Sequence, residues 1–155
     1  MTTTFTPTAD PSDLQATGVQ TTASAPATAG RAGEKLWRTG ATAGIVASGA
    51  TAAVAALARG ADISLKVSGQ AIPVAGFAQL TFVASLIGIV IAIVASHRAS
   101  RPQRTFVRST LALTLVSIVP DVLADAQTAT RLTLALTHIV AAAIVIPALA
   151  SRLHD

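Results

Sequence analysis

Long stretches without a charged side chain constrain this 155-residue chain more than any other feature. Residues 39–58 and 132–151 are uncharged runs of 20 residues each, and residues 71–96 form a run of 26. An α-helix rises 1.5 Å per residue, so about 20 residues match the ~30 Å hydrocarbon core of a bilayer. These runs are predicted to cross a membrane as helices, because lipid offers backbone N–H and C=O groups no partner.

A fourth span is predicted between the second and the last of these runs. Residues 109–120 are uncharged, and the segment reaches about 18–20 residues if its helix begins near Thr105 and ends near Ala124. The runs lack the alternating ~10-residue segments of a transmembrane barrel. The predicted fold is therefore an all-α membrane protein, a four-helix transmembrane bundle with helices at about 37–59, 72–97, 103–124 and 129–152.

The composition favours lipid as the solvent of the folded chain. Charged residues make up 12% of the sequence, whereas a soluble domain carries about 25% to cover its surface. The chain is basic, with a net charge of +4, but its cations lie in short clusters beside apolar runs. A nucleic-acid interface instead needs a basic face with interleaved aromatic residues. The lipid bilayer is the predicted partner, and nucleic acid is not.

The first residues differ in composition from the rest of the chain. Residues 1–30 are rich in Thr, Ala, Ser, Pro and Gly and carry few bulky apolar side chains. Such a segment buries too little surface to offset the entropy of ordering, so a disordered cytoplasmic tail is predicted over 1–35, before a membrane domain over 36–153. Cleavage after a signal peptide at 56–58 is the alternative; the long segment before the run argues against it.

The distribution of Lys and Arg predicts the orientation in the membrane. Eight of the eleven lie before the first span, between the second and third, or after the fourth. Cations stay on the cytoplasmic side, so both termini are predicted to be cytoplasmic and the membrane to be the plasma membrane. The loop between spans two and three carries the topogenic residues Arg98, Arg101, Arg104 and Arg108, whose alternative role is contact with anionic lipid. Trp37, flanked by cations, is interpreted as an interface anchor.

Local motifs predict the connections and the helix packing. Alternating polarity over residues 63–67 and a Ser68-Gly69 turn predict a small hairpin, and Pro73 and Pro102 are predicted to begin helices. Small residues also recur at helical spacing, which lets helix backbones approach closely in lipid. They are Gly40, Gly44, Ser48, Ala52 and Ala56 in the first span, and Thr81, Ser85, Gly88 and Ala92 in the second.

Three polar residues are predicted to lie in the outer leaflet, one on each of three helices. They are Gln79, Asp121 and His138. Thr110, Thr114 and Ser117 form a polar stripe that leads to Asp121, and Asp125 continues it by another four residues. Ionisable groups in a membrane are costly, so each needs a reason. Either the three form a cluster that binds a cation or relays a proton, or each satisfies a neighbouring helix and fixes the packing.

Motifs of catalysis are not found in the sequence. It has no phosphate-binding P-loop, no H-E-x-x-H pair, no G-x-S-x-G elbow and no cysteine. The chain is therefore predicted not to be an enzyme and to need no cofactor or metal. A structural role, or interaction with another copy or another membrane protein, is the first functional hypothesis. The alternative is a small transporter or proton-linked sensor that uses the outer-leaflet cluster.

Several short segments carry a resemblance to a known family. They are residues 36–40, 72–80, 104–107, 117–121 and 136–142, with Ile146 and Pro147 beyond the last. On these segments, the chain from Trp37 to Leu153 is similar to uncharacterised four-span membrane proteins of actinobacteria, a family of unknown function. The resemblance implies a four-span membrane fold and no particular activity.

Overall fold

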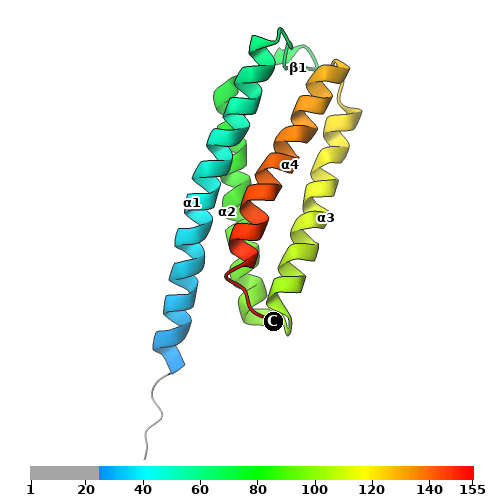
Figure 1. Ribbon diagram of the computed structural model, residues 1–155. Helices are drawn as coiled ribbons and strands as arrows, with labels where there is room; N and C mark the ends of the chain where they lie inside the picture. The colour runs from blue at the N-terminus through cyan, green and yellow to red at the C-terminus, as the bar shows by residue number, and fades with distance from the viewer. Residues whose placement is uncertain (1–24) are drawn as a thin grey trace, which may run out of the picture.

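Four long helices account for most of the chain in the computed structural model, which describes residues 25–155, with side chains from residue 33 (Figure 1). They form an antiparallel bundle in which α1 packs mainly on α2 and α4, while α3 packs on α4 and α2. The elements are α1 Ala25–Gly60, β1 Lys66–Val67, β2 Gln70–Ala71, α2 Val74–Arg98, α3 Pro102–Leu123 and α4 Thr128–Ala150.

All four helices are long and apolar enough to cross a membrane. Their outer surfaces are apolar, since large side chains such as Leu57, Leu115 and Leu123 are at least two-thirds exposed. An exposed apolar surface of this extent is stable in hydrocarbon and costly in water. The protein is therefore a multi-pass membrane protein, and the prediction of a four-helix transmembrane bundle is confirmed.

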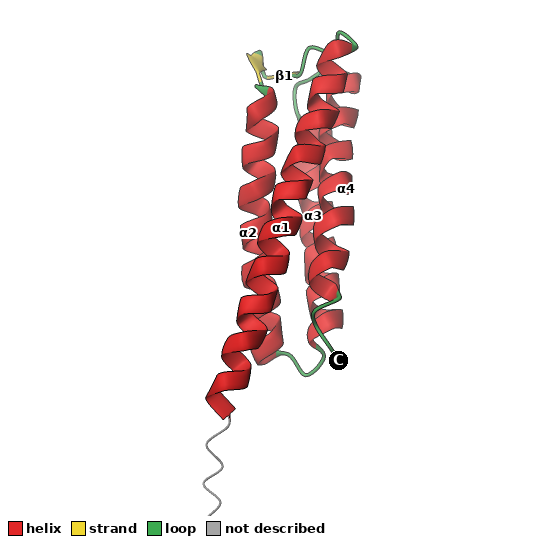
Figure 2. Cartoon of the chain, turned by 60° about the vertical axis from the view of Figure 1, so that its left-hand side comes forward, coloured by secondary structure: helices red, strands yellow, loops and turns green. Residues whose placement is uncertain are grey.

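The start of α1 differs from the predicted boundary. The helix begins at Ala25, so residues 25–35, assigned to the disordered tail, are helical; residues 1–24 of that tail lie outside the described residues. Alanine is the best helix former, and Pro26 is tolerated in the first turn because its missing N–H has no intrahelical partner there. Figures 1 and 2 show this end of α1 projecting past the other helices, beside the end where the chain terminates.

The hairpin forms as the turn sequence predicts. β1 pairs with β2, Lys66 opposite Ala71 and Val67 opposite Gln70. Ser68 and Gly69 both have positive φ, 50° and 79°, which is the backbone of a type I′ two-residue turn. The Ser68 N–H donates to the backbone oxygen of Asp125 at 2.8 Å, so the hairpin is tied to the α3–α4 connection. Figure 2 shows it at the end of the bundle opposite the C-terminus.

Two apolar clusters fill the bundle, one toward each end. The larger, at the end with the C-terminus, includes Phe106, Ile89 and Leu149, all fully buried. The smaller, under the hairpin, is built around Leu65, Phe77 and Leu134. Between them α1 and α2 are joined by a hydrogen bond of 2.9 Å between Thr51 Oγ1 and Thr81 Oγ1. Phe77 and Leu134 of the smaller cluster also line a cavity.

Candidate functional site

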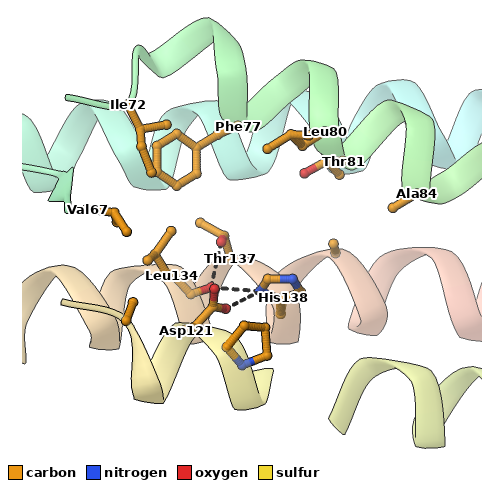
Figure 3. Close-up of a pocket in the computed structure, with 13 residues that line it drawn as sticks. Val67, Ile72, Phe77, Leu80, Thr81, Ala84, Asp121, Leu134, Thr137 and His138 are labelled. Carbon is orange, nitrogen blue, oxygen red and sulfur yellow. Dashed lines mark hydrogen bonds and ion pairs between the residues drawn. The ribbon is translucent and has the colours of Figure 1, made fainter. Parts of the chain in front are cut away.

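An acid and a histidine meet in the half of the bundle below the hairpin. Asp121 lies in the last turn of α3 and His138 lies in the middle of α4. The carboxylate Oδ2 is 2.9 Å from the imidazole Nδ1 (Figure 3). The Asp121 side chain is 16% exposed and the His138 side chain 36%. The structure therefore brings these two side chains into contact.

The hydrogen bonds around this pair leave one acceptor, a carboxylate oxygen of Asp121, without a donor. His138 Nδ1 lies 3.1 Å from the backbone oxygen of Leu134, one turn earlier, and the Thr137 hydroxyl donates to the same oxygen at 2.7 Å. Asp121 Oδ2 is buried and, among the described residues, no donor reaches it with hydrogen-bond geometry, despite the short contact to the ring. Burying a carboxylate oxygen without a hydrogen-bond donor costs free energy, and a bound group that donates a hydrogen bond would remove that cost.

The pair lines a cavity of about 350 Å³ enclosed by three helices and the hairpin. Figure 3 shows Phe77, Leu80 and Thr81 of α2 across the cavity from Asp121 and His138. Asp121 and His138 are the two ionisable residues of the lining. The rest of the lining is mostly apolar. It comprises Val67, Ile72, Ala84, Pro120, Ala124, Leu134, Thr137 and Ala141.

Gln79 does not join this cluster, in contrast to the prediction. It is exposed and is not part of the cavity lining. The reason is helical geometry: Phe77 and Thr81, two residues to either side, both face the cavity, and a step of two residues rotates a side chain by about 200°. Gln79 therefore lies on the outer face of α2, and the structure brings together two of the three residues predicted to cluster.

The other hydroxyls of the α3 stripe are turned back onto their own helix. Thr110 Oγ1 donates to Phe106 O at 2.7 Å, Thr114 to Thr110 O at 2.9 Å, and Ser117 to Thr114 O at 2.8 Å. Such bonds satisfy a hydroxyl in lipid without any partner helix. The stripe is therefore not a continuous polar path toward Asp121.

Pro120 and four residues that were not predicted for the site complete it. Pro120 lacks an N–H and leaves a carbonyl one turn earlier without its helical donor, directly before Asp121. Phe77, Thr81, Leu134 and Thr137 line the cavity but are not among the predicted site residues. Leu134, four residues before His138, is the one that spacing could have indicated, since side chains one helical turn apart share a face.

The described residues contain no group of three or more His, Cys, Asp or Glu side chains able to hold a metal ion. The acid and the histidine are thus a two-residue site. Such a pair can accept a hydrogen bond, hold a proton or attract a cation.

Comparison with known proteins identifies the family of this chain. A model described as a family of unknown function (DUF6069) matches residues 31–155. The chain belongs to this family. The predicted resemblance to four-span proteins of unknown function is confirmed, whereas an actinobacterial origin stays a prediction. No curated protein and no solved structure matches the chain.

The predicted topogenic arginines of this DUF6069 protein gather at the opposite end from the cavity. Arg98 ends α2, while Arg101, Arg104 and Arg108 lie at or just after the start of α3, and all four are exposed. Arg104 Nε lies 3.4 Å from Asp155 Oδ2. Trp37 is half-exposed on α1 near the same end, where an interface anchor is expected.

Proposed function

We propose that this DUF6069 protein is a non-enzymatic membrane protein that binds a small amphiphile in the cavity below the hairpin. It acts as a sensor or carrier whose occupancy is linked to protonation of Asp121 and His138. One observation carries the proposal: a buried carboxylate oxygen, 2.9 Å from an imidazole, lines a cavity and lacks a hydrogen-bond donor among the described residues.

The chemistry of the lining defines the ligand class. Hydrocarbon side chains such as Phe77, Leu80 and Leu134 suit an apolar body. The carboxylate of Asp121 suits a head group that is cationic or donates a hydrogen bond. We therefore infer a ligand with a short hydrocarbon part and an amine-like head.

Protonation follows from the same two residues. A carboxylate that binds a cationic head must be ionised, and a proton on either Asp121 or His138 changes the charge that the ligand meets. Protons and a cationic ligand therefore compete at the pair. This competition supports a proton-linked sensor or carrier over a purely structural role for the cavity.

The experiment uses the full-length protein in lipid nanodiscs and a series of n-alkylamines, with thermal unfolding as the readout. An amine that fits the cavity raises Tm because it binds the folded state alone, which adds about 2.7 kcal/mol to the free energy of unfolding at 100 times its Kd. The alcohol of equal chain length raises it less. Asp121→Asn removes the preference for the amine, and Gln79→Leu, on the outer face of α2, keeps it.

Two results would overturn this proposal. One is a set of alkylamines that leave Tm unchanged at every chain length. The other is an Asp121→Asn protein that still prefers amine over alcohol to the same degree, because the head group would then be recognised elsewhere.

The orientation and the membrane are part of the proposal. We infer that both termini and the arginine-bearing α2–α3 loop are cytoplasmic in the plasma membrane, and that the cavity lies in the outer leaflet. The concentration of exposed arginines at the end with the C-terminus supports this orientation.

A second candidate function is interaction with another copy of this chain or another membrane protein. Gln79 favours it, because its amide lies exposed on the outer face of a membrane-spanning helix. Lipid offers an amide no hydrogen-bond partner, and a neighbouring helix does.

A further inference from the structure

A second hollow lies between α1 and α4, at the end of the bundle that carries the C-terminus. Its volume is about 430 Å³. Arg38 of α1 and Arg152, which follows α4 by two residues, both line it. Eight residues deeper on each helix, or about 12 Å along the axis, Val46 and Ile144 line the same groove. The groove therefore has a cationic mouth and an apolar interior.

The two guanidinium groups have no anionic partner among residues 33–155. The ion pairs there are Arg104 with Asp155 and His138 with Asp121. Glu34 lies four residues before Arg38, a spacing that permits pairing on a helix, yet it forms no ion pair with it. Two like charges lining one hollow repel, and an anion that contacts both relieves that repulsion.

The C-terminal residues hold Arg152 in place. Leu153 is 3% exposed, and its N–H donates to Ala150 O at 3.1 Å. Asp155 Oδ1 then accepts from the Gln103 N–H at 2.9 Å and the Arg104 N–H at 3.3 Å, which caps the start of α3. The backbone on both sides of Arg152 is thus held in place, which keeps this residue at the mouth of the groove.

We propose that this groove binds one anionic phospholipid of the surrounding leaflet. Its phosphate contacts Arg38 and Arg152, with the Thr39 hydroxyl beside them, and an acyl chain lies along Val46, Ile144 and Ala148. Guanidinium groups bind phosphate oxygens in a bidentate manner. A free phosphate would use only the mouth, whereas the apolar length below it matches a hydrocarbon chain. The occupant is therefore a lipid rather than a soluble anion.

Trp37, the only tryptophan, directly precedes Arg38 and reports on lipid at this site. The full-length protein is reconstituted in phosphatidylcholine vesicles, and phosphatidylglycerol with brominated acyl chains is added at increasing mole fraction. Bromine quenches Trp37 on contact, so the titration gives the preference for the anionic lipid over brominated phosphatidylcholine. Each guanidinium near an anionic surface adds about fivefold. Arg152→Gln, on the far helix, is expected to lower the preference about fivefold, and Arg38→Gln/Arg152→Gln to abolish it.

Matched controls separate a groove from general attraction to charge. Arg98→Gln/Arg101→Gln removes the same charge at the same end, outside the groove, and should lower the preference less than the groove pair does; Arg38→Lys/Arg152→Lys should keep part of it. The proposal is overturned if the wild type shows no preference, if the control pair lowers it as much as the groove pair, or if millimolar inorganic phosphate abolishes it. The last result would identify a soluble-anion site.

Discussion

Many polar side chains of the spans are satisfied by their own helix, whereas Asp121 and Gln79 are not. Hydroxyls on short side chains reach carbonyls of their own helix, as Ser48 does to Gly44 O at 2.7 Å and Ser85 to Thr81 O at 2.8 Å. The carboxylate of Asp121 is too highly charged, and the side chain of Gln79 too long, to be satisfied by a carbonyl of its own helix. One lines a cavity beside His138, and the other points outward. Function is therefore to be sought at these two residues.

Gln79 provides a test of the interaction hypothesis. Replacing it with leucine removes the amide from the outer face of α2 and is expected to weaken association between copies by about 0.6–2 kcal/mol, the range for interhelical hydrogen bonds in lipid. Energy transfer between labelled copies, measured over a range of protein-to-lipid ratios, gives the association constant. Val83→Leu, one turn further on the same exposed helix, should leave it unchanged. Equal association of Gln79→Leu and wild type would remove the support for a partner at this face.

The site was only partly predictable because sequence spacing fixes the face of one helix and not the rotation of its neighbours. Asp121 and His138 could be predicted, since ionisable residues are rare in spans and both stand near the same membrane depth. The exclusion of Gln79 depends on how α2 is rotated about its axis. That rotation is set by the contacts of Ser85 and Ile89 with α1, which spacing alone does not reveal.

At the level of elements, α1 and α2 pack closely because two glycines leave room. A Cβ added to Gly40 would overlap the Ile89 side chain, and one added to Gly44 would lie 2.9 Å from Ser85 Cβ. The predicted strip of small residues on α1 is right at these two positions and wrong at Ala56, which is exposed. A strict four-residue repeat turns about 40° per step away from a straight helical face. The buried face instead continues through Ala47, Thr51 and Ala55.

This packing makes opposite predictions for two glycines of the same helix. Gly44→Ala forces a methyl group against Ser85 Cβ, which is fixed to the backbone, and should destabilise the bundle by about 1–3 kcal/mol. Gly49→Ala meets nothing within 4 Å and should be neutral or slightly stabilising, because alanine is the better helix former. Unfolding in mixed detergent gives both values. Similar losses for the two variants would show that α1 and α2 are not packed in this way.

At the scale of the whole molecule, the two ends of the bundle have different chemistry. One end has the cavity, the hairpin and the acid–histidine pair. The other has exposed arginines, both ends of the described chain and the groove between α1 and α4. Charge-free runs were enough to predict the four spans, because hydrocarbon thickness and backbone hydrogen bonding fix their length. The two hollows are each lined by residues of several elements, so they are a property of the assembled bundle rather than of any one run.

The asymmetry predicts which end faces the cytoplasm. The sequence contains no cysteine, so single-cysteine variants can be labelled without removing native thiols. Ser64→Cys lies before β1 at the hairpin end, and Ser100→Cys lies in the α2–α3 loop; both positions are exposed. Because cations are retained in the cytoplasm, a membrane-impermeant maleimide should label Ser64→Cys in intact cells and Ser100→Cys only after lysis. Labelling of Ser100→Cys in intact cells would show that the orientation is the reverse of the proposed one. The cavity would then lie in the inner leaflet and the proposed lipid groove in the outer leaflet.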